Sequence, residues 1–113
     1  MASTLEGYRF VCDRADLPTR GKKTVHLDDV KLLIVACDTG IYALEDRDPQ
    51  TGGSIAHGEV LDCVLTSPNT GAKYSLKDGR LIEEQTALTV LTHWLPMWHV
   101  RVVDDQVFVS PTV

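Results

Sequence analysis

Four polar residues in two short loops are the positions of this sequence best suited to chemistry. The loops read Asp48-Pro49-Gln50-Thr51-Gly52 and Ser67-Pro68-Asn69-Thr70-Gly71. One carboxylate, one amide and two hydroxyls stand at the four positions Asp48, Gln50, Ser67 and Thr70. These groups form hydrogen bonds, and none of them is a soft metal ligand. A proline stiffens each loop and a glycine permits a tight turn, so the sequence predicts two rigid loops with polar tips.

We expect these polar groups to form a hydrogen-bonded network that bridges the two loops, because each group can donate or accept. The alternative is that they are ordinary loop residues facing water. Weak binding of a hard cation by the Asp48 carboxylate is a third possibility.

The elements that must position the loops are short strands separated by turn signals. No segment keeps an apolar period of 3.6 residues over ten or more residues, so the pattern favours an all-β barrel or sandwich. We expect one domain over residues 1–113, with its core at about 7–109. The expected strands are Tyr8–Cys12, Lys23–Leu27, Val30–Cys37, Ile41–Leu44, Glu59–Thr66, Lys73–Leu76, Arg80–Ile82, Thr89–Thr92, Met97–Val103 and Gln106–Val109.

The two loops resemble those of the Rieske-type iron–sulfur module, whose ligands follow C-x-H and C-x-x-H patterns about 16 residues apart. The prolines, glycines and spacing agree, whereas all four cluster ligands are absent. Asp48 and Ser67 stand in place of the cysteines, and Gln50 and Thr70 in place of the histidines. The resemblance implies a Rieske-type fold, a small barrel or sandwich capped by a two-loop subdomain, without its [2Fe–2S] cluster.

More narrowly, the sequence is similar to the small subunit of assimilatory, cytoplasmic NAD(P)H-dependent nitrite reductase. The similarity covers roughly residues 7–109 and includes Tyr8-Arg9-Phe10, Ile41-Tyr42-Ala43-Leu44, Gly58, Ala72–Leu76, Val100-Arg101-Val102 and Gln106–Val109. In that family a large subunit carries flavin, a [4Fe–4S] cluster and sirohaem and reduces nitrite to ammonium. The resemblance therefore implies a non-catalytic subunit with no cofactor or metal, bound to that large subunit in nitrate assimilation. Two alternatives remain, namely an accessory domain of another oxidoreductase and a Rieske ferredoxin that carries electrons.

Composition limits the remaining classes of function. The net charge is −5 and the only basic cluster is Arg20, Lys22 and Lys23, so nucleic-acid binding is not expected. No apolar run is long enough to span a membrane, and no signal peptide is evident. We therefore expect a soluble, cytoplasmic protein.

Cys12, Cys37 and Cys63 are odd in number and widely spaced, and each lies in an apolar run. This pattern predicts buried, unreactive thiols in a reducing compartment. His57, His93 and His99 lack the spacing of a metal site. No nucleophile elbow, P-loop or dinucleotide motif occurs, so no catalytic residue is expected.

The segment Trp94-Leu95-Pro96-Met97-Trp98 carries a large apolar load for a connection between strands. Packing into the core is one interpretation. An exposed anchor for a partner is the other, because Trp and Met are enriched at interface cores. With the loop tips, the candidate partner-binding residues are Pro49, Gly52, Pro68, Gly71, Trp94, Met97 and Trp98.

Overall fold

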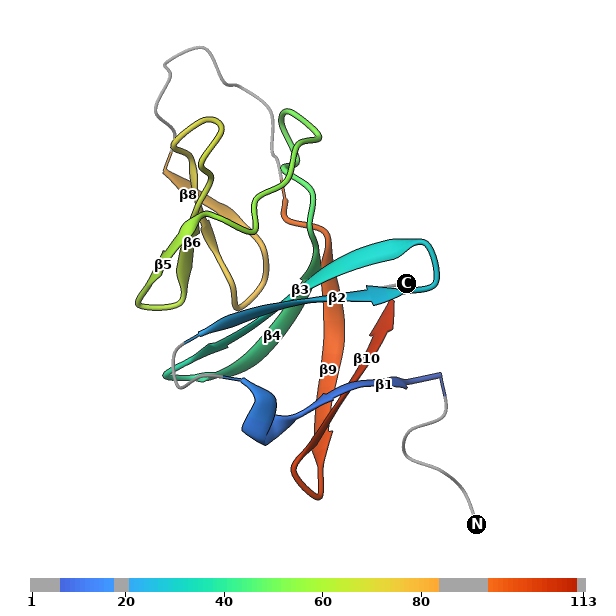
Figure 1. Cartoon of the computed structure of the whole chain (residues 1–113). Helices are drawn as coiled ribbons and strands as arrows, with labels where there is room; N and C mark the ends of the chain where they lie inside the picture. Colours follow the sequence, from blue (N-terminus) through green and yellow to red (C-terminus); the bar gives the residue numbers. More distant parts are fainter. Residues whose placement is uncertain (1–6, 18–20, 84–93, 112–113) are drawn as a thin grey trace.

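A computed structural model describes residues 7–17, 21–83 and 94–111 of the chain. Within them, two antiparallel sheets make up almost all of the regular structure (Figure 1). The first sheet has six strands, in the order β1 (Arg9–Asp13), β10 (Gln106–Pro111), β9 (Met97–Val103), β4 (Gly40–Glu45), β3 (Val30–Cys37) and β2 (Lys22–Leu27). A short 3-10 helix, η1 (Arg14–Asp16), follows β1.

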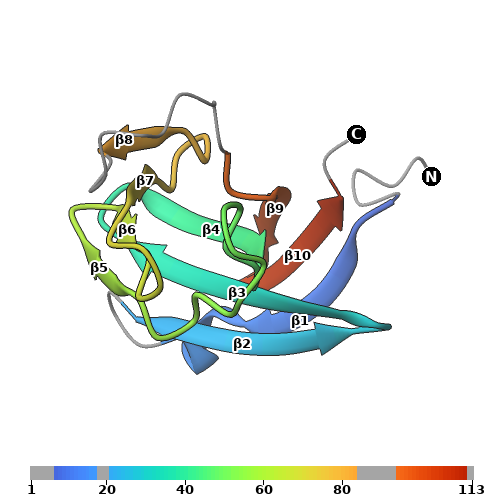
Figure 2. The same ribbon diagram turned by 90° about the horizontal axis from the view of Figure 1, so that it is seen from above.

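The second sheet has four strands, in the order β5 (Glu59–Leu61), β6 (Val64–Thr66), β7 (Lys73–Ser75) and β8 (Leu81–Glu83). Seen from above, the six-stranded sheet curls into a nearly closed barrel and the four-stranded sheet packs on one side of it (Figure 2). The structure thus confirms the predicted all-β fold.

Strand β3 lies between the two hydrophobic cores of the molecule and contributes side chains to both. Leu32 and Ile34 are buried inside the barrel, whereas Leu33 and Val35 are buried against the four-stranded sheet. Because successive side chains of a strand point to opposite faces, a strand covered on both faces must be apolar throughout. This is the physical reason for the continuous apolar run of residues 32–37 within β3.

The expected single strand Glu59–Thr66 is instead a hairpin of two strands, β5 and β6. Asp62 and Cys63 form its turn with φ values of 52° and 60°. Two left-handed residues in succession make the tight turn that suits a two-residue hairpin, although Asn and Gly are the usual residues there. The expected strand Thr89–Thr92 lies outside the described residues, and the other predicted strands differ only at their ends.

The prediction of three unreactive thiols is wrong for Cys37 and Cys63, which form a disulfide. The turn after β3 and the turn between β5 and β6 meet at one edge of the molecule, so the two Cα atoms lie 5.6 Å apart. That separation is within the usual range for a disulfide. Cys12 is a free, buried thiol as predicted, and burial is the main cause that raises its pKa.

Candidate functional site

The first loop connects β4 to β5, and the Asp48 side chain organises its tip. One carboxylate oxygen, Oδ1, accepts hydrogen bonds from the backbone N–H groups of Gln50 (2.7 Å) and Thr51 (3.1 Å). The Asp48 N–H donates to the carbonyl of Gly53 (2.7 Å), and the Gly52 N–H donates to the carbonyl of Asp48 (2.8 Å). Gly52 turns the chain with a φ of 79°. The carboxylate therefore holds the tip in a closed turn.

The second loop connects β6 to β7 and repeats this arrangement around Ser67. The Ser67 Oγ accepts hydrogen bonds from the N–H groups of Asn69 (3.1 Å) and Thr70 (3.3 Å). The Ser67 N–H donates to the carbonyl of Ala72 (2.8 Å), and the Gly71 N–H donates to the carbonyl of Ser67 (2.9 Å). Gly71 has a φ of 80°, almost the same as Gly52. The two tips thus share one backbone design.

The two tips are joined directly by side chains. The Ser67 hydroxyl donates a hydrogen bond to the second carboxylate oxygen of Asp48, and the Asn69 amide lies 3.4 Å from the same oxygen. Asn69 also donates to the carbonyl of Ser54 (3.1 Å). Asp48 is 1% exposed and Ser67 2% exposed, so the link between them is buried. The expected network between the loops is confirmed, with Asp48 at its centre.

Gln50 and Thr70 take smaller parts in this network. The Gln50 amide donates to the phenol oxygen of Tyr74 (3.1 Å), a fully buried residue of β7. The Thr70 Oγ1 accepts from the Ala72 N–H (3.2 Å) and so stays within its own loop. Gln50 therefore ties the first tip to the four-stranded sheet. Asn69 was not among the predicted residues, although an amide between Pro68 and Thr70 in a polar tip was a visible signal.

A second buried carboxylate, Asp46, lies just before the first tip. It accepts hydrogen bonds from the Ser54 hydroxyl (2.7 Å) and the Ile55 N–H (2.8 Å), and its Oδ2 pairs with the Lys31 ammonium at 3.0 Å. Its side chain is fully buried. These contacts fix both ends of the loop that carries the tip. Nothing in the sequence marked Asp46, because its partners come from β3 and from the far side of the loop.

The surroundings of both carboxylates favour the charged form. Burial by itself raises the pKa of Asp48, but hydrogen bonds from Ser67, Gln50, Thr51 and Asn69 outweigh it and lower the pKa below its ordinary 3.8. Burial also raises the pKa of Asp46 by itself. Hydrogen bonds from Ser54, Lys31 and Ile55, together with the charge of Lys31, outweigh this effect of burial. The pKa of Asp46 is therefore lowered as well.

This pattern predicts a loss of stability in acid. Because the folded pKa of each carboxyl lies below the unfolded value, the stabilisation is fully present above that value and is lost as the pH falls through the folded pKa. We expect the free energy of unfolding, measured by urea titration, to fall between about pH 5 and pH 3. Asp48→Asn should flatten this dependence, whereas Glu59→Gln, at an exposed position, should not. An unchanged slope in Asp48→Asn would contradict the assignment.

The loops, the barrel and the four-stranded sheet together define a Rieske-type β structure with a two-loop subdomain. A family model for the Rieske-like [2Fe-2S] domain matches residues 7–110. The chain belongs to this family. A comparison with curated proteins found no match.

Solved structures with this fold include both reductase and oxygenase components. One, provisionally described as the small subunit of an NADPH nitrite reductase, is 28% identical with a TM-score of 0.74, over 90% of this chain and 96% of that one. A chain from the complex of oxygenase and ferredoxin in carbazole 1,9a-dioxygenase is 20% identical with a TM-score of 0.79, over 95% and 97%. The terminal oxygenase of carbazole 1,9a-dioxygenase from Novosphingobium sp. KA1 is 21% identical with a TM-score of 0.84, over 94% of this chain and 30% of that one. The last two likenesses concern the fold alone.

The residues at the loop tips do not fit a [2Fe–2S] cluster. Such a cluster needs thiolates on one iron and, in the Rieske form, neutral imidazoles on the other. The tips offer a carboxylate, an amide and two hydroxyls, and the Ser67 hydroxyl is already engaged with Asp48. Among the described residues no group of three or more His, Cys, Asp or Glu side chains is arranged to hold a metal ion. His57 and His99 are exposed, and His93 lies outside the described part of the chain.

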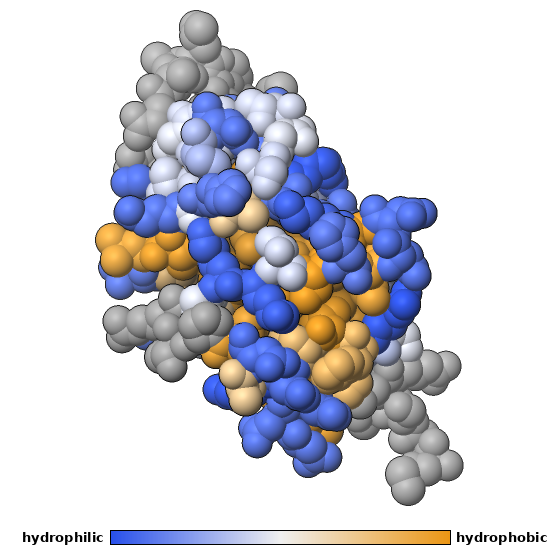
Figure 3. All heavy atoms as spheres, in the orientation of Figure 1, coloured by the Kyte–Doolittle hydropathy of each residue, from blue (hydrophilic) through white to orange (hydrophobic). Residues whose placement is uncertain are grey.

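The candidate partner-binding residues fall into two places on the surface. At the tips, Gly52 and Pro68 are exposed, and Pro49 and Gly71 are half-buried. In Figure 3 the region of the tips is covered by hydrophilic and weakly polar residues.

In the segment Trp94–Trp98, some residues pack into the core and one is exposed as a partner anchor would be. Leu95 is buried, and Met97 and Trp98 pack against the two cores, so these residues support the fold. Trp98 also donates its indole N–H to Glu45 (3.1 Å). Trp94, by contrast, is 48% exposed and lines a groove of about 370 Å³ with Glu45, Asp78 and Pro96. Trp94 is therefore the exposed member of the segment, and the half-buried Met97 and Trp98 line the same groove.

Proposed function

We propose that this chain is a cluster-free, non-catalytic small subunit of a cytoplasmic NAD(P)H-dependent nitrite reductase. It would act by binding a large subunit that carries flavin, a [4Fe–4S] cluster and sirohaem. The observation that carries this proposal is the buried hydrogen bond between Ser67 and Asp48. It closes the space between the loop tips with protein groups where the family's pattern has metal ligands.

A further observation supports the proposal. The structure described as a nitrite reductase small subunit matches over nearly the whole length of both chains, at 28% identity. Apart from this, no helix among the described residues has the length and apolar character needed to cross a membrane.

The decisive experiment joins metal analysis with co-purification. The purified chain should contain no stoichiometric iron or acid-labile sulfide and should show no absorption between about 400 and 600 nm. When it is expressed with the large sirohaem subunit from the same host, the two should elute together from a size-exclusion column. Iron and sulfide in the isolated chain would support the ferredoxin alternative instead. Co-purification with a different oxidoreductase would support the accessory-domain alternative.

The exposed Trp94 gives a sharper prediction for the contact surface. Truncating an exposed aromatic anchor at an interface usually weakens binding by about tenfold or more. We expect Trp94→Ala to weaken binding of the large subunit by that factor, as measured by biolayer interferometry. Phe10→Ala is the matched control, because Phe10 is also 48% exposed but lies on β1, outside the groove. Equal affinities for the two variants would place the contact elsewhere, with the loop tips as the next candidates.

A further inference from the structure

The disulfide between Cys37 and Cys63 lies at an accessible place on the molecule. Cys37 ends β3 and Cys63 lies in the turn between β5 and β6, so the bond links the six-stranded sheet to the four-stranded sheet. The bond is not needed to bring the sheets together. They already share a core in which Leu33 and Val35 of β3 pack against residues of the other sheet such as Leu65. The disulfide is therefore a local link at one edge of an interface that stands without it.

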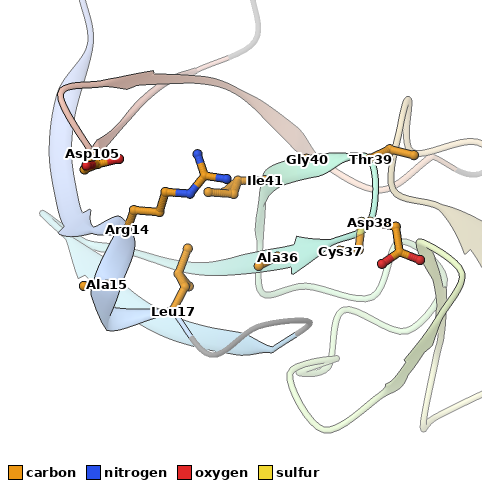
Figure 4. A pocket seen from close by; sticks show the side chains of 10 residues that line it. All are labelled: Arg14, Ala15, Leu17, Ala36, Cys37, Asp38, Thr39, Gly40, Ile41 and Asp105. Carbon is orange, nitrogen blue, oxygen red and sulfur yellow. The ribbon is translucent and has the colours of Figure 1, made fainter.

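The two cysteine residues differ in their access to solvent. Cys63 is 4% exposed, whereas Cys37 is half-buried. Cys37 lines a cavity of about 880 Å³ that also includes Arg14, Asp38 and Gly40 (Figure 4). It also lines a smaller cavity of about 70 Å³, which it shares with Cys63. Because Cys37 is the less buried residue of the pair, it is the half of the bond that an incoming thiol would reach more readily.

The backbone at Cys63 is in a disfavoured conformation. Its φ of 60° lies in the left-handed region, directly after Asp62 at 52°. A side chain with a Cβ atom is disfavoured there, and glycine is the usual residue in the second position of such a turn. A cysteine at this position is therefore not chosen for the turn. Exposed disulfides are more easily reduced than buried ones, and this disulfide is partly exposed on the Cys37 side.

The structure also places a hydrogen-bond partner at the sulfur that would leave. The Thr39 hydroxyl lies 3.3 Å from the Cys63 Sγ and 2.7 Å from the Tyr42 phenol oxygen. When the bond breaks, Thr39 can donate to the Cys63 thiolate while it accepts from Tyr42. The carboxylates of Asp38 and Asp62, adjacent in sequence to the two cysteines, oppose this negative charge. The Thr39 hydroxyl therefore contributes more to stabilising the Cys63 thiolate here than it would in a site without these carboxylates.

We propose that Cys37–Cys63 is a site of thiol–disulfide exchange that is reduced by a dithiol. A thiolate of the dithiol attacks the Cys37 sulfur, a mixed disulfide forms, and Cys63 leaves as a thiolate bonded to Thr39. The second thiol of the reductant then attacks the reductant's own sulfur in the mixed disulfide and releases Cys37. Two electrons pass to the protein, the dithiol becomes a disulfide, and its two protons end on Cys37 and Cys63. Reduction frees the turn between β5 and β6 from the end of β3.

The exchange needs no large subunit, so it is tested on the isolated chain. Its outcome is therefore independent of the proposed function. The air-oxidised protein is treated with dithiothreitol at several concentrations, and the free thiols are alkylated at intervals and counted by mass spectrometry. We expect a reduction rate proportional to the dithiothreitol concentration, because the native protein is attacked. A rate that is independent of dithiothreitol would mean that reduction waits for unfolding, and would overturn the proposal. Failure of Cys37 and Cys63 to form a disulfide in air would do the same.

Two further measurements test the direction of attack. With 2-mercaptoethanol the trapped mixed disulfide should map to the peptide of Cys37, and a mixed disulfide on Cys63 would contradict the proposed order. Thr39→Val should slow reduction by about fivefold, the equivalent of one ordinary hydrogen bond. Thr24→Val, at an exposed position of β2, is the matched control and should leave the rate unchanged. Equal rates for the two variants would remove Thr39 from the mechanism.

Discussion

Replacing Asp48 with alanine is expected to lower the free energy of unfolding by about 3 kcal/mol. The substitution removes the acceptor of the Ser67 hydroxyl and of the N–H groups of Gln50 and Thr51. Each donor left without a partner in a buried site costs about 1–3 kcal/mol, although water entering the new space would recover part of that cost. Equilibrium unfolding in urea, followed by tryptophan fluorescence, measures the difference.

Glu59→Ala is the control for this substitution, because it also removes one carboxylate but from an exposed position on β5. It should change stability by no more than about 0.5 kcal/mol. Asp48→Asn should fall between the two, since its amide keeps one acceptor oxygen for the N–H groups of Gln50 and Thr51. If Asp48→Ala were as stable as Glu59→Ala, the network between the loop tips would be incidental to folding.

The elements of the fold that could be predicted from sequence are the strands whose side chains are buried on one face or on both faces. Strand β3 was predicted with its observed bounds, because its central residues are buried on both faces and form an apolar run that only Lys31 interrupts near one end. The loops after β4 and β6 were predicted because proline and glycine mark them.

The part that could not be predicted depends on contacts between distant segments. Asp62 suits the first position of the turn that separates β5 from β6, but Cys63 stands where glycine is usual, so the turn signal is weak. The disulfide was missed for a related reason. Cys37 and Cys63 are 26 residues apart, and only the packing of one sheet on the other brings them together.

The candidate site shows the same division. Asp48 and Ser67 were predicted from their positions in the two loop patterns, and they form the central contact. The other contacts came from residues that stand at no ligand position of the pattern, namely Asn69, Tyr74 and Asp46. Asn69 lies in the second tip itself, and its amide was a visible signal. Tyr74 lies on β7 and Asp46 pairs with Lys31 of β3, so only the three-dimensional structure can assign these two.

The second large effect is expected at the disulfide. The cross-link closes a chain segment with a sequence separation of 26 residues. In the chain-entropy model, a loop of that size stabilises the folded state by about 3.5 kcal/mol, because the unfolded chain loses conformational freedom. The double variant Cys37→Ser/Cys63→Ser should therefore unfold at a markedly lower urea concentration than the oxidised protein.

The reduced wild-type protein provides the internal control for this prediction. In excess dithiothreitol, the stability of the wild-type protein should fall to that of the double variant. The double variant itself should not respond to the reductant, because its remaining cysteine, Cys12, has no partner for a disulfide within the chain. If the oxidised and reduced proteins unfolded at the same urea concentration, the cross-link would contribute nothing to folding. A large difference would mean that the redox state of this one bond sets the stability of the folded chain, as expected for a cross-link that restricts the unfolded state.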